Sequence, residues 1–186
     1  MVSASSAGAP DSLRVAIWRK LHSLGALYVQ QSVCLLPARP EVRRDVRRLV
    51  DRVRGQGGSA RVLTIRFDDP AEEAQIVAEL SSARDDEYGE LLDRVPAFMA
   101  ELQMERARAR ATYEEVEESE ADLERFRAWL AKIDRRDYFG AARRTEAHTA
   151  VDECTGALEA FESEAFARDD QSQSGGRCTL RAVEDA

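Results

Sequence analysis

The sequence predicts an α+β protein in which a small ferredoxin-like sheet unit is followed by a helical extension. Up to residue 67, short runs rich in Val, Leu and Tyr alternate with amphipathic helix patterns. Beyond it, apolar residues recur mainly at three- and four-residue spacing, which is typical of packed helices. The expected organisation is a disordered N-terminus over 1–12, a sheet unit over 13–67, a helical region over 68–170 and a disordered tail over 171–186.

The predicted sheet unit begins with a helix. Ser12 is a favourable N-cap and Gly25 a favourable C-cap for this helix. Two short strands at 26–30 and 32–36, a helix ending at Gly55 and the strand RVLTIRF follow. This order is that of a βαββαβ unit without its first strand. The segment MVSASSAGAP has no apolar run to replace that central strand, so we expect it to be missing and the last strand to lack its partner.

The helical region has clear start and stop signals. Asp69, Pro70 and Glu72 match an N-cap, a first helical position and a capping box. Pro96 should interrupt or restart the next helix. Two apolar stripes then predict an antiparallel helix hairpin, with one arm near 100–134 and the other near 143–168.

Charge is distributed unevenly along the chain. Residues 1–66 hold 12 Lys/Arg against 4 Asp/Glu, a net charge of about +8, whereas the remainder holds 15 against 31, about −16. The formal net charge of −8 therefore describes a strongly polarised molecule. Such asymmetry favours an anionic partner for the basic part.

The second predicted helix carries the densest group of basic residues. Its apolar stripe consists of Val42, Val46, Leu49, Val50 and Val53. Its exposed surface should carry two adjacent rows of arginines, namely Arg43, Arg44, Arg47 and Arg48. Arg14, Arg19 and Lys20, which lie off the apolar stripe of the first helix, are further candidates. Contact with DNA phosphates is one interpretation of this surface, and an ordinary solvated helix face is the other.

Other kinds of site are not expected. Cys34, Cys154 and Cys178 match neither a disulfide framework nor paired metal ligands, and Cys34 lies in an apolar run typical of a buried thiol. The chain has no GxSxG, P-loop or dinucleotide motif, so neither an enzyme nor a cofactor is expected. No run approaches the ~20 apolar residues of a membrane span, and the N-terminus lacks a signal-peptide pattern. We expect a cytosolic protein without a membrane partner.

Four segments carry a family resemblance. RVAIWRKLHSLGALYVQQSVCLLPARPEV is followed by EYGELL, by ATYEEVEESEADLERFRAWLAKI and by RDYFGA. In this order, from about residue 13 to about residue 168, they resemble the N-terminal domain of the bacterial chromate resistance regulator ChrB. The first part also resembles the sheet domain of PaaX-type repressors, which is related in form to a CRISPR adaptation nuclease.

The resemblance implies a transcriptional regulator that binds promoter DNA of chromate resistance genes and releases it when chromate is present. Chromate is a tetrahedral dianion, which an arginine cluster could hold through charge-assisted hydrogen bonds. On this resemblance, we expect both the family's apolar first strand and its C-terminal domain to be missing from this sequence. The alternatives are a non-catalytic helical interaction module, including a homodimer, and a truncated fragment without function.

Overall fold

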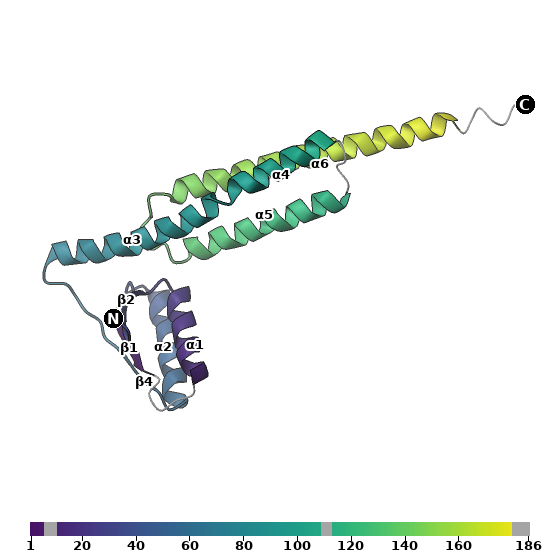
Figure 1. Ribbon diagram of the computed structural model, residues 1–186. Helices are drawn as coiled ribbons and strands as arrows, with labels where there is room; N and C mark the ends of the chain where they lie inside the picture. The colour runs from purple at the N-terminus through teal and green to yellow at the C-terminus, as the bar shows by residue number, and fades with distance from the viewer. Residues whose placement is uncertain (6–10, 109–112, 180–186) are drawn as a thin grey trace, which may run out of the picture. The chain divides into compact units, whose positions relative to one another are not determined.

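The computed structural model describes residues 1–5, 11–108 and 113–179, and the chain forms two compact units (Figure 1). Unit 1 consists of Met1–Glu87 and Lys132–Ala142, and unit 2 of Tyr88–Ala131 and Arg143–Ala186. The chain thus leaves unit 1 within one long helix and returns to it at the end of another. The boundary expected at residue 67 lies inside unit 1.

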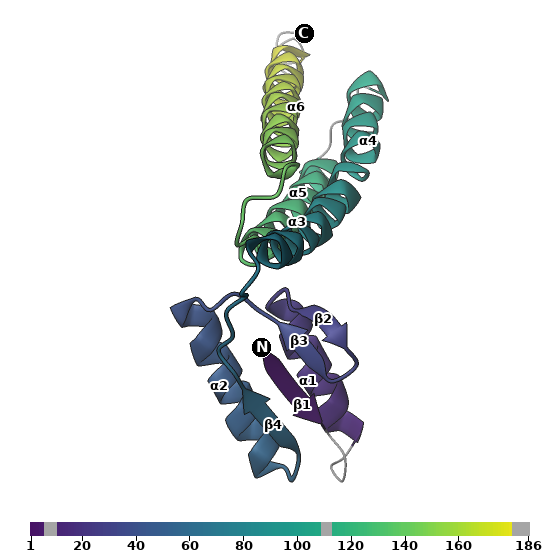
Figure 2. The same cartoon turned by 90° about the vertical axis from the view of Figure 1, so that its left-hand side faces the viewer.

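Unit 1 is a four-stranded antiparallel sheet with two helices, in the order βαββαβ. Its strands are β1 (Val2–Ser5), β2 (Leu27–Gln30), β3 (Val33–Leu35) and β4 (Ser59–Val62). Its first two helices are α1 (Asp11–Ser23) and α2 (Pro40–Gly55). The spatial order is β2-β3-β1-β4, so β1 lies between β3 and β4 (Figure 2). The predicted α+β class is therefore confirmed.

The first strand is present, so the prediction that it is missing was wrong. Residues 2–5, inside the expected disordered N-terminus, form β1, in which Val2 pairs with both Cys34 and Val62. Of the four residues VSAS only Val2 is fully buried, with 3% exposure. Backbone hydrogen bonds to strands far away in the sequence define β1, and these do not depend on a run of large apolar side chains.

The core of unit 1 lies between the sheet and the two helices. Its buried side chains are Val2, Leu13, Ile17, Leu21, Cys34, Val42, Val46, Leu49, Val50, Val53 and Ala60. Both predicted helix stripes are therefore buried. Gly25 follows α1 with a φ of +68°, a conformation that favours glycine at a helix end.

The segment Lys132–Ala142 is the second part of unit 1. The Tyr138 hydroxyl donates a 2.9 Å hydrogen bond to the Leu24 carbonyl, and the Tyr138 ring packs against the core. The Arg39 guanidinium lies 5.3 Å from the centroid of that ring. Asp137, which is 8% exposed, accepts hydrogen bonds from the backbone N–H groups of Gly140 and Ala141. These contacts hold the returning segment against the sheet unit.

Three charged side chains, Arg136 of this segment and Arg84 and Glu87 of the chain before it, come together, with side-chain exposures of 15%, 8% and 17%. Arg84 and Arg136 both donate hydrogen bonds to the Glu87 carboxylate, at 2.7 Å and 2.5 Å. Arg84 is 7% exposed, and neither its Nε atom nor that of Arg136 has a hydrogen-bond partner. We call these three residues the buried arginine cluster.

The helices beyond the sheet are α3 (Pro70–Leu92), α4 (Val95–Arg108), α5 (Tyr113–Asp134) and α6 (Arg144–Thr179). As predicted, α3 begins at Pro70, and Asp69 accepts a 2.8 Å hydrogen bond from the Ala71 N–H. The break between α3 and α4 falls at residues 93–94, and Pro96, as the second residue of α4, lies where a new helix starts, which is one of the two roles expected for it.

In unit 2, each of the helices α4, α5 and α6 contacts the other two. Phe98 of α4 and Phe126 of α5 meet edge to face at 5.6 Å. Arg106 of α4 forms an ion pair with Glu164 of α6, and Arg127 of α5 donates a 3.1 Å hydrogen bond to Thr155 of α6. Figure 1 shows α5 running opposite to both α4 and α6.

The hairpin arms differ from their expected bounds. The first expected arm, 100–134, is divided between α4 and α5, and residues 109–112 lie outside the described residues. The second arm, α6, extends to Thr179, into the segment expected to be a disordered tail. Residues 180–186 of that tail also lie outside the described residues.

Candidate nucleic-acid interface

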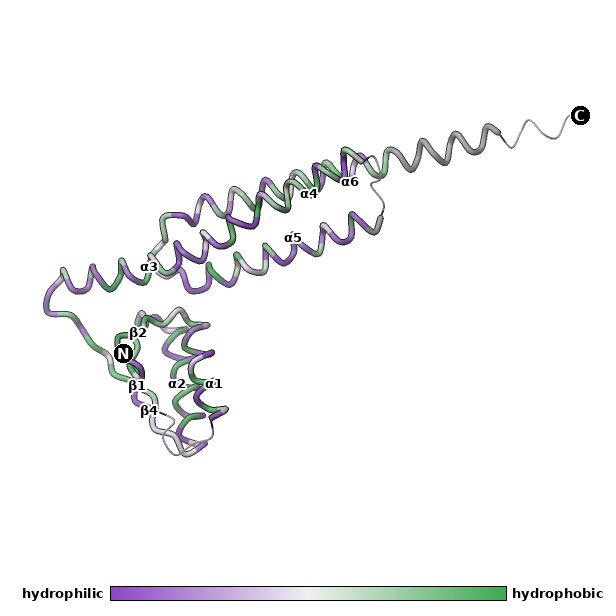
Figure 3. Tube along the Cα trace, in the orientation of Figure 1, coloured by the Kyte–Doolittle hydropathy of each residue, from purple (hydrophilic) through white to green (hydrophobic). Residues whose placement is uncertain are grey.

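The candidate interface is the outer face of α2. Pro40 is favourable in its first turn, and five apolar residues at helical spacing bury its inner side. Hydrophobic and hydrophilic residues consequently alternate along α2 in Figure 3. All four candidate arginines, Arg43, Arg44, Arg47 and Arg48, are exposed. We call their common surface the arginine face.

One row of the arginine face lies beside the end of β4. Arg43 approaches the Thr64 hydroxyl at 3.4 Å, which is too long for a strong hydrogen bond. Arg54, about three helical turns beyond Arg43, is held firmly because its Nε and Nη2 atoms both donate to the Ala60 carbonyl, at 3.2 and 2.9 Å. Within the described residues, no hydrogen bond or ion pair holds Arg47. Its guanidinium is available to a ligand.

The other row surrounds Asp45. Lys20 of α1 forms a 2.6 Å salt bridge with this carboxylate, and Arg48 lies 3.8 Å from it. The hydrogen bond from Lys20 lowers the pKa of Asp45 below its ordinary value, and the charges of Lys20, Arg48 and Arg44 act in the same direction. A single carboxylate therefore faces three cations. The Arg48 side chain is 82% exposed, so its pairing with Asp45 is weak.

The three candidates on α1 lie in different surroundings. Lys20 joins the arginine face through Asp45, whereas Arg19 is simply exposed on α1. Arg14 lines a separate hollow of about 350 Å³ together with Trp18 and Tyr28. The structure thus brings Lys20, but not Arg14, to the arginines of α2.

Trp18, near Arg14, is an exposed aromatic residue. Its side chain is 53% exposed and stacks on His22, with ring centroids 5.1 Å apart. Helix periodicity places Trp18 next to the apolar stripe of α1. Its position one step off the stripe of Leu13, Ile17 and Leu21 is the signal for exposure.

The thiols of Cys34 and Cys154 are buried. Cys34 is 1% exposed, and burial raises the pKa of its thiol to about 11. Burial also raises the pKa of the Cys154 thiol. Within the described residues, no group of His, Cys, Asp and Glu is arranged to hold a metal ion. No helix among them is long and apolar enough to cross a membrane.

The buried arginine cluster was not foreseen from the sequence. Arg84 and Glu87 are one helical turn apart on α3, but Arg136 comes from the returning segment. The i,i+3 spacing of Arg84 and Glu87 is a signal that can be recognised in the sequence. The contact of Glu87 with Arg136, 49 residues further on, leaves no such local signal. Because two guanidinium groups share one carboxylate, the cluster links α3 to the returning segment within unit 1.

The fold and the surface define the chain as a ferredoxin-like α+β protein with a helical extension and an arginine-rich helix face. A family model described as "Protein ChrB, N-terminal" matches residues 14–172, and the chain therefore belongs to this family. Membership confirms the resemblance and relates the chain to the chromate resistance regulator. Searches of curated proteins and of solved structures found no match.

Proposed function

We propose that this protein is a chromate-responsive transcriptional regulator that binds promoter DNA of chromate resistance genes through the arginine face. The observation that carries the proposal is the contrast between the two faces of α2, of which one is apolar and buried and the other carries exposed arginines. Five buried apolar residues fix the helix to the sheet, and four arginines remain exposed with at most weak partners. Arginines fixed on a rigid element suit contact with phosphates, because guanidinium groups bind them through charge-assisted hydrogen bonds.

The chemistry of the arginine face supports phosphate contact in particular. Asp45 is its one half-buried acidic side chain, and Lys20 occupies that carboxylate at 2.6 Å. The surrounding arginines therefore keep most of their positive charge for a partner. A polyanion releases its counterions on such a surface, which makes the affinity depend steeply on salt.

A gel shift against the upstream DNA of its own gene tests the proposal. Arg43, Arg44, Arg47 and Arg48 are changed together to Glu, and binding should be abolished. Circular dichroism should stay almost unchanged, since exposed substitutions typically cost within about 0.5 kcal/mol each. A matched control carries the same change of net charge on exposed positions outside α1 and α2, namely Arg94, Arg125, Lys132 and Arg144.

The control variant should bind as the wild type does. If the four-arginine variant of α2 binds as tightly as the wild type, the arginine face is merely solvated. If both variants lose binding equally, net charge rather than α2 governs the interaction. Either result contradicts the assignment of the interface.

Chromate response, a cytosolic location and the lack of an enzymatic activity belong to the same proposal and rest on the family and the sequence. Adding chromate to the protein–DNA complex should release the DNA, whereas sulfate, an equally charged tetrahedral anion, should not. Equal release by both anions would indicate simple ionic competition.

An interaction module is the second candidate function. Met104 of α4 and Phe166 of α6 are each 51% exposed, and exposed apolar side chains of this size can form part of a contact with another protein. If no variant binds DNA and the protein self-associates through unit 2, this second function replaces the first. Sedimentation of Met104→Ser and Phe166→Ser variants would then show loss of the assembly.

A further inference from the structure

The two edges of the sheet in unit 1 differ in how they are protected. The strand order β2-β3-β1-β4 makes β2 and β4 the outer strands (Figure 2). An outer strand presents unpaired N–H and C=O groups, and proteins commonly protect such an edge with charged side chains or cover it. The residues beside β4 and β2 therefore show which edge is available for pairing with another chain.

The backbone of β4 is capped by an arginine of α2. The Ala4 N–H bonds to the Ser32 carbonyl on the β3 side, so Ala4 and its register partner Ala60 form a pair without hydrogen bonds between them. The Ala60 carbonyl consequently points away from β1, towards the edge. Arg54 donates two hydrogen bonds to this carbonyl, at 3.2 and 2.9 Å.

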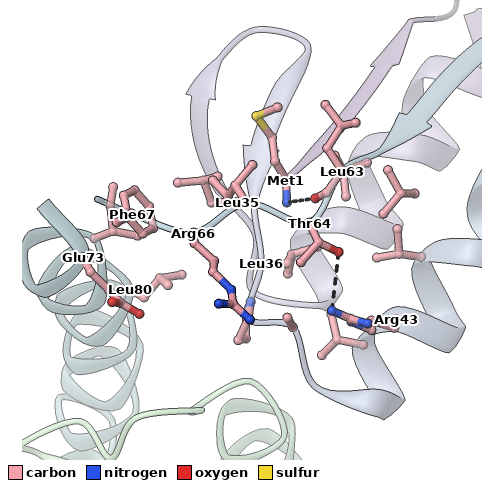
Figure 4. Close-up of a pocket in the computed structure, with 18 of the residues that line it drawn as sticks. Met1, Leu35, Leu36, Arg43, Leu63, Thr64, Arg66, Phe67, Glu73 and Leu80 are labelled. Atoms are coloured by element: carbon pink, nitrogen blue, oxygen red, sulfur yellow. Dashed lines mark hydrogen bonds between the residues drawn. The ribbon is translucent and has the colours of Figure 1, made fainter. Parts of the chain in front are cut away.

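Further positive charge lies along the same edge. Arg61 is an exposed residue of β4 itself. Figure 4 shows the continuation of the strand, where Arg43 of α2 approaches Thr64. The β4 edge is therefore protected in the way that is usual for soluble proteins.

The backbone of β2 is open at its outer side. Because Ala4 bonds to Ser32, Val2 and Cys34, two positions along the ladder, also form a hydrogen-bonded pair. The polar backbone groups of Cys34 thus face β1, and those of its β2 partner Tyr28 face away from β3. Within residues 1–5, 11–108 and 113–179, no group bonds to the outward N–H and C=O of Tyr28.

The β2 edge also lacks charge. Residues 21–38 form the longest run of the sequence without Asp, Glu, Lys or Arg, although 33% of all residues are charged. On β2 itself, Tyr28 is 38% and Val29 56% exposed. A contact between two copies of one chain brings identical residues together, so that any charge in it meets its like. The β2 edge is the part of the basic sheet unit where two copies can meet without such repulsion.

An exposed apolar patch lies beside β2 on the helix side of the sheet. A hollow of about 350 Å³ is lined there by Tyr28 of β2 and by Val15 and Trp18 of α1. Val15 is 45% and Trp18 53% exposed. Aromatic side chains grouped in this way are typical of protein–protein contacts.

We propose that two copies of this chain form a dimer in which their β2 strands pair antiparallel about a two-fold axis at Tyr28. Tyr28 then lies opposite its own copy, and the two residues exchange both of their outward N–H···O bonds. Their side chains lie together on the helix side, where each ring packs against the patch that contains Trp18. The neighbouring residues Leu27 and Val29 are apolar, so no charge enters the paired strands.

The dimer does not depend on the proposed DNA binding, because β2 and the arginine face of α2 belong to different elements. Sedimentation equilibrium of the full chain without DNA measures it. Tyr28→Lys and Tyr28→Glu each place two like charges opposite one another, and each should raise the dissociation constant of the dimer at least about tenfold. Val62→Lys changes a residue of β4 that is 44% exposed, and this matched control should leave the constant unchanged.

A mixture of the two Tyr28 variants makes the test independent of folding. Equal amounts of Tyr28→Lys and Tyr28→Glu should associate with each other more tightly than either variant does with itself, because opposite charges then meet across the axis. This recovery requires folded protein and therefore cannot result from unfolding.

Three results would overturn the proposal. A wild type that stays monomeric at every concentration would show that no second copy covers β2. A dimer that persists in both Tyr28 variants but is lost in Phe166→Ser would place the contact in unit 2. A mixture as monomeric as its two components would show that Tyr28 does not face its own copy.

Discussion

Two groups of arginines in this protein differ in their surroundings, since one is exposed to solvent and the other is largely buried and ion-paired. On α2, Arg44, Arg47 and Arg48 point outwards, and the carboxylate nearest to them is already occupied by Lys20. In the buried cluster, Arg84 and Arg136 share Glu87 and have side-chain exposures of 8% and 15%. The same side chain is thus a free charge in one place and a structural connector in the other.

The difference lies in solvation. A guanidinium in water keeps its charge at little energetic cost and can exchange water for a phosphate. A buried guanidinium has lost water and depends on its carboxylate partner. Burial lowers the pKa of Arg84, while Glu87 counteracts that effect. Removing charge from the first group should therefore change binding, and removing it from the second should change stability.

The largest expected loss of stability comes from a substitution in the buried arginine cluster. Glu87→Gln removes the carboxylate that Arg84 and Arg136 share and leaves Asp137 as the remaining negative charge that acts on Arg84, so it should reduce the free energy of unfolding by about 3–5 kcal/mol. Urea denaturation at pH 7 measures this. A loss below about 1 kcal/mol would mean that water reaches the cluster and that the contrast with α2 is not real.

A smaller effect separates the two faces of α2. Leu49, which is 6% exposed, touches the core, and Leu49→Ala should cost about 2–3 kcal/mol. Its neighbour Arg48 is exposed, so Arg48→Ala should cost within about 0.5 kcal/mol. Equal losses from the two variants in thermal denaturation would contradict the assigned burial of this helix.

The salt bridge between α1 and α2 should contribute less. Asp45→Asn removes the partner of Lys20 and should cost about 0.2–1 kcal/mol at pH 7. Because the folded protein lowers the pKa of Asp45, this contribution exists above the unfolded pKa of about 4 and disappears as pH falls through the folded pKa. The two proteins should therefore become equally stable in acid. A difference that grows on acidification would refute this explanation.

The Asp45→Asn variant should also bind DNA at least as tightly as the wild type, since it removes a negative charge from the arginine face.

The smallest expected change in stability concerns the carboxylate of Glu162 in unit 2. Burial, together with repulsion from Glu120 and Glu159, raises the pKa of Glu162. Ionisation of Glu162 thus destabilises the fold above its folded pKa, and this penalty vanishes below the unfolded pKa of about 4.3. Glu162→Gln should raise the melting temperature at pH 7 and lose that advantage near pH 4. A constant advantage at both pH values would show that charge is not the cause.

Local signals in the sequence predicted most helices but not the contacts between distant segments. Pro70 and Pro96 marked helix starts correctly, and the valines of α2 identified its buried side. The strand β1 was missed because VSAS is defined by pairing with residues 33–34 and 59–62. The return of Tyr138 to Leu24 was missed for the same reason, since 114 residues separate them. The arginine face could be predicted because helical periodicity alone determines it, whereas the occupation of Asp45 by Lys20 required the packing of α1 on α2.

The salt dependence of DNA binding tests the role of α2 most directly. Binding of the wild type and of an Arg47→Gln, Arg48→Gln variant to the same upstream duplex is measured by fluorescence anisotropy across a range of salt concentrations. Each phosphate contact contributes about −0.9 to the slope of log K against log salt. We expect a steep slope for the wild type and a slope shallower by about 1–2 for the variant. Equal slopes for the two proteins would contradict it, because they would show that these arginines touch no phosphate.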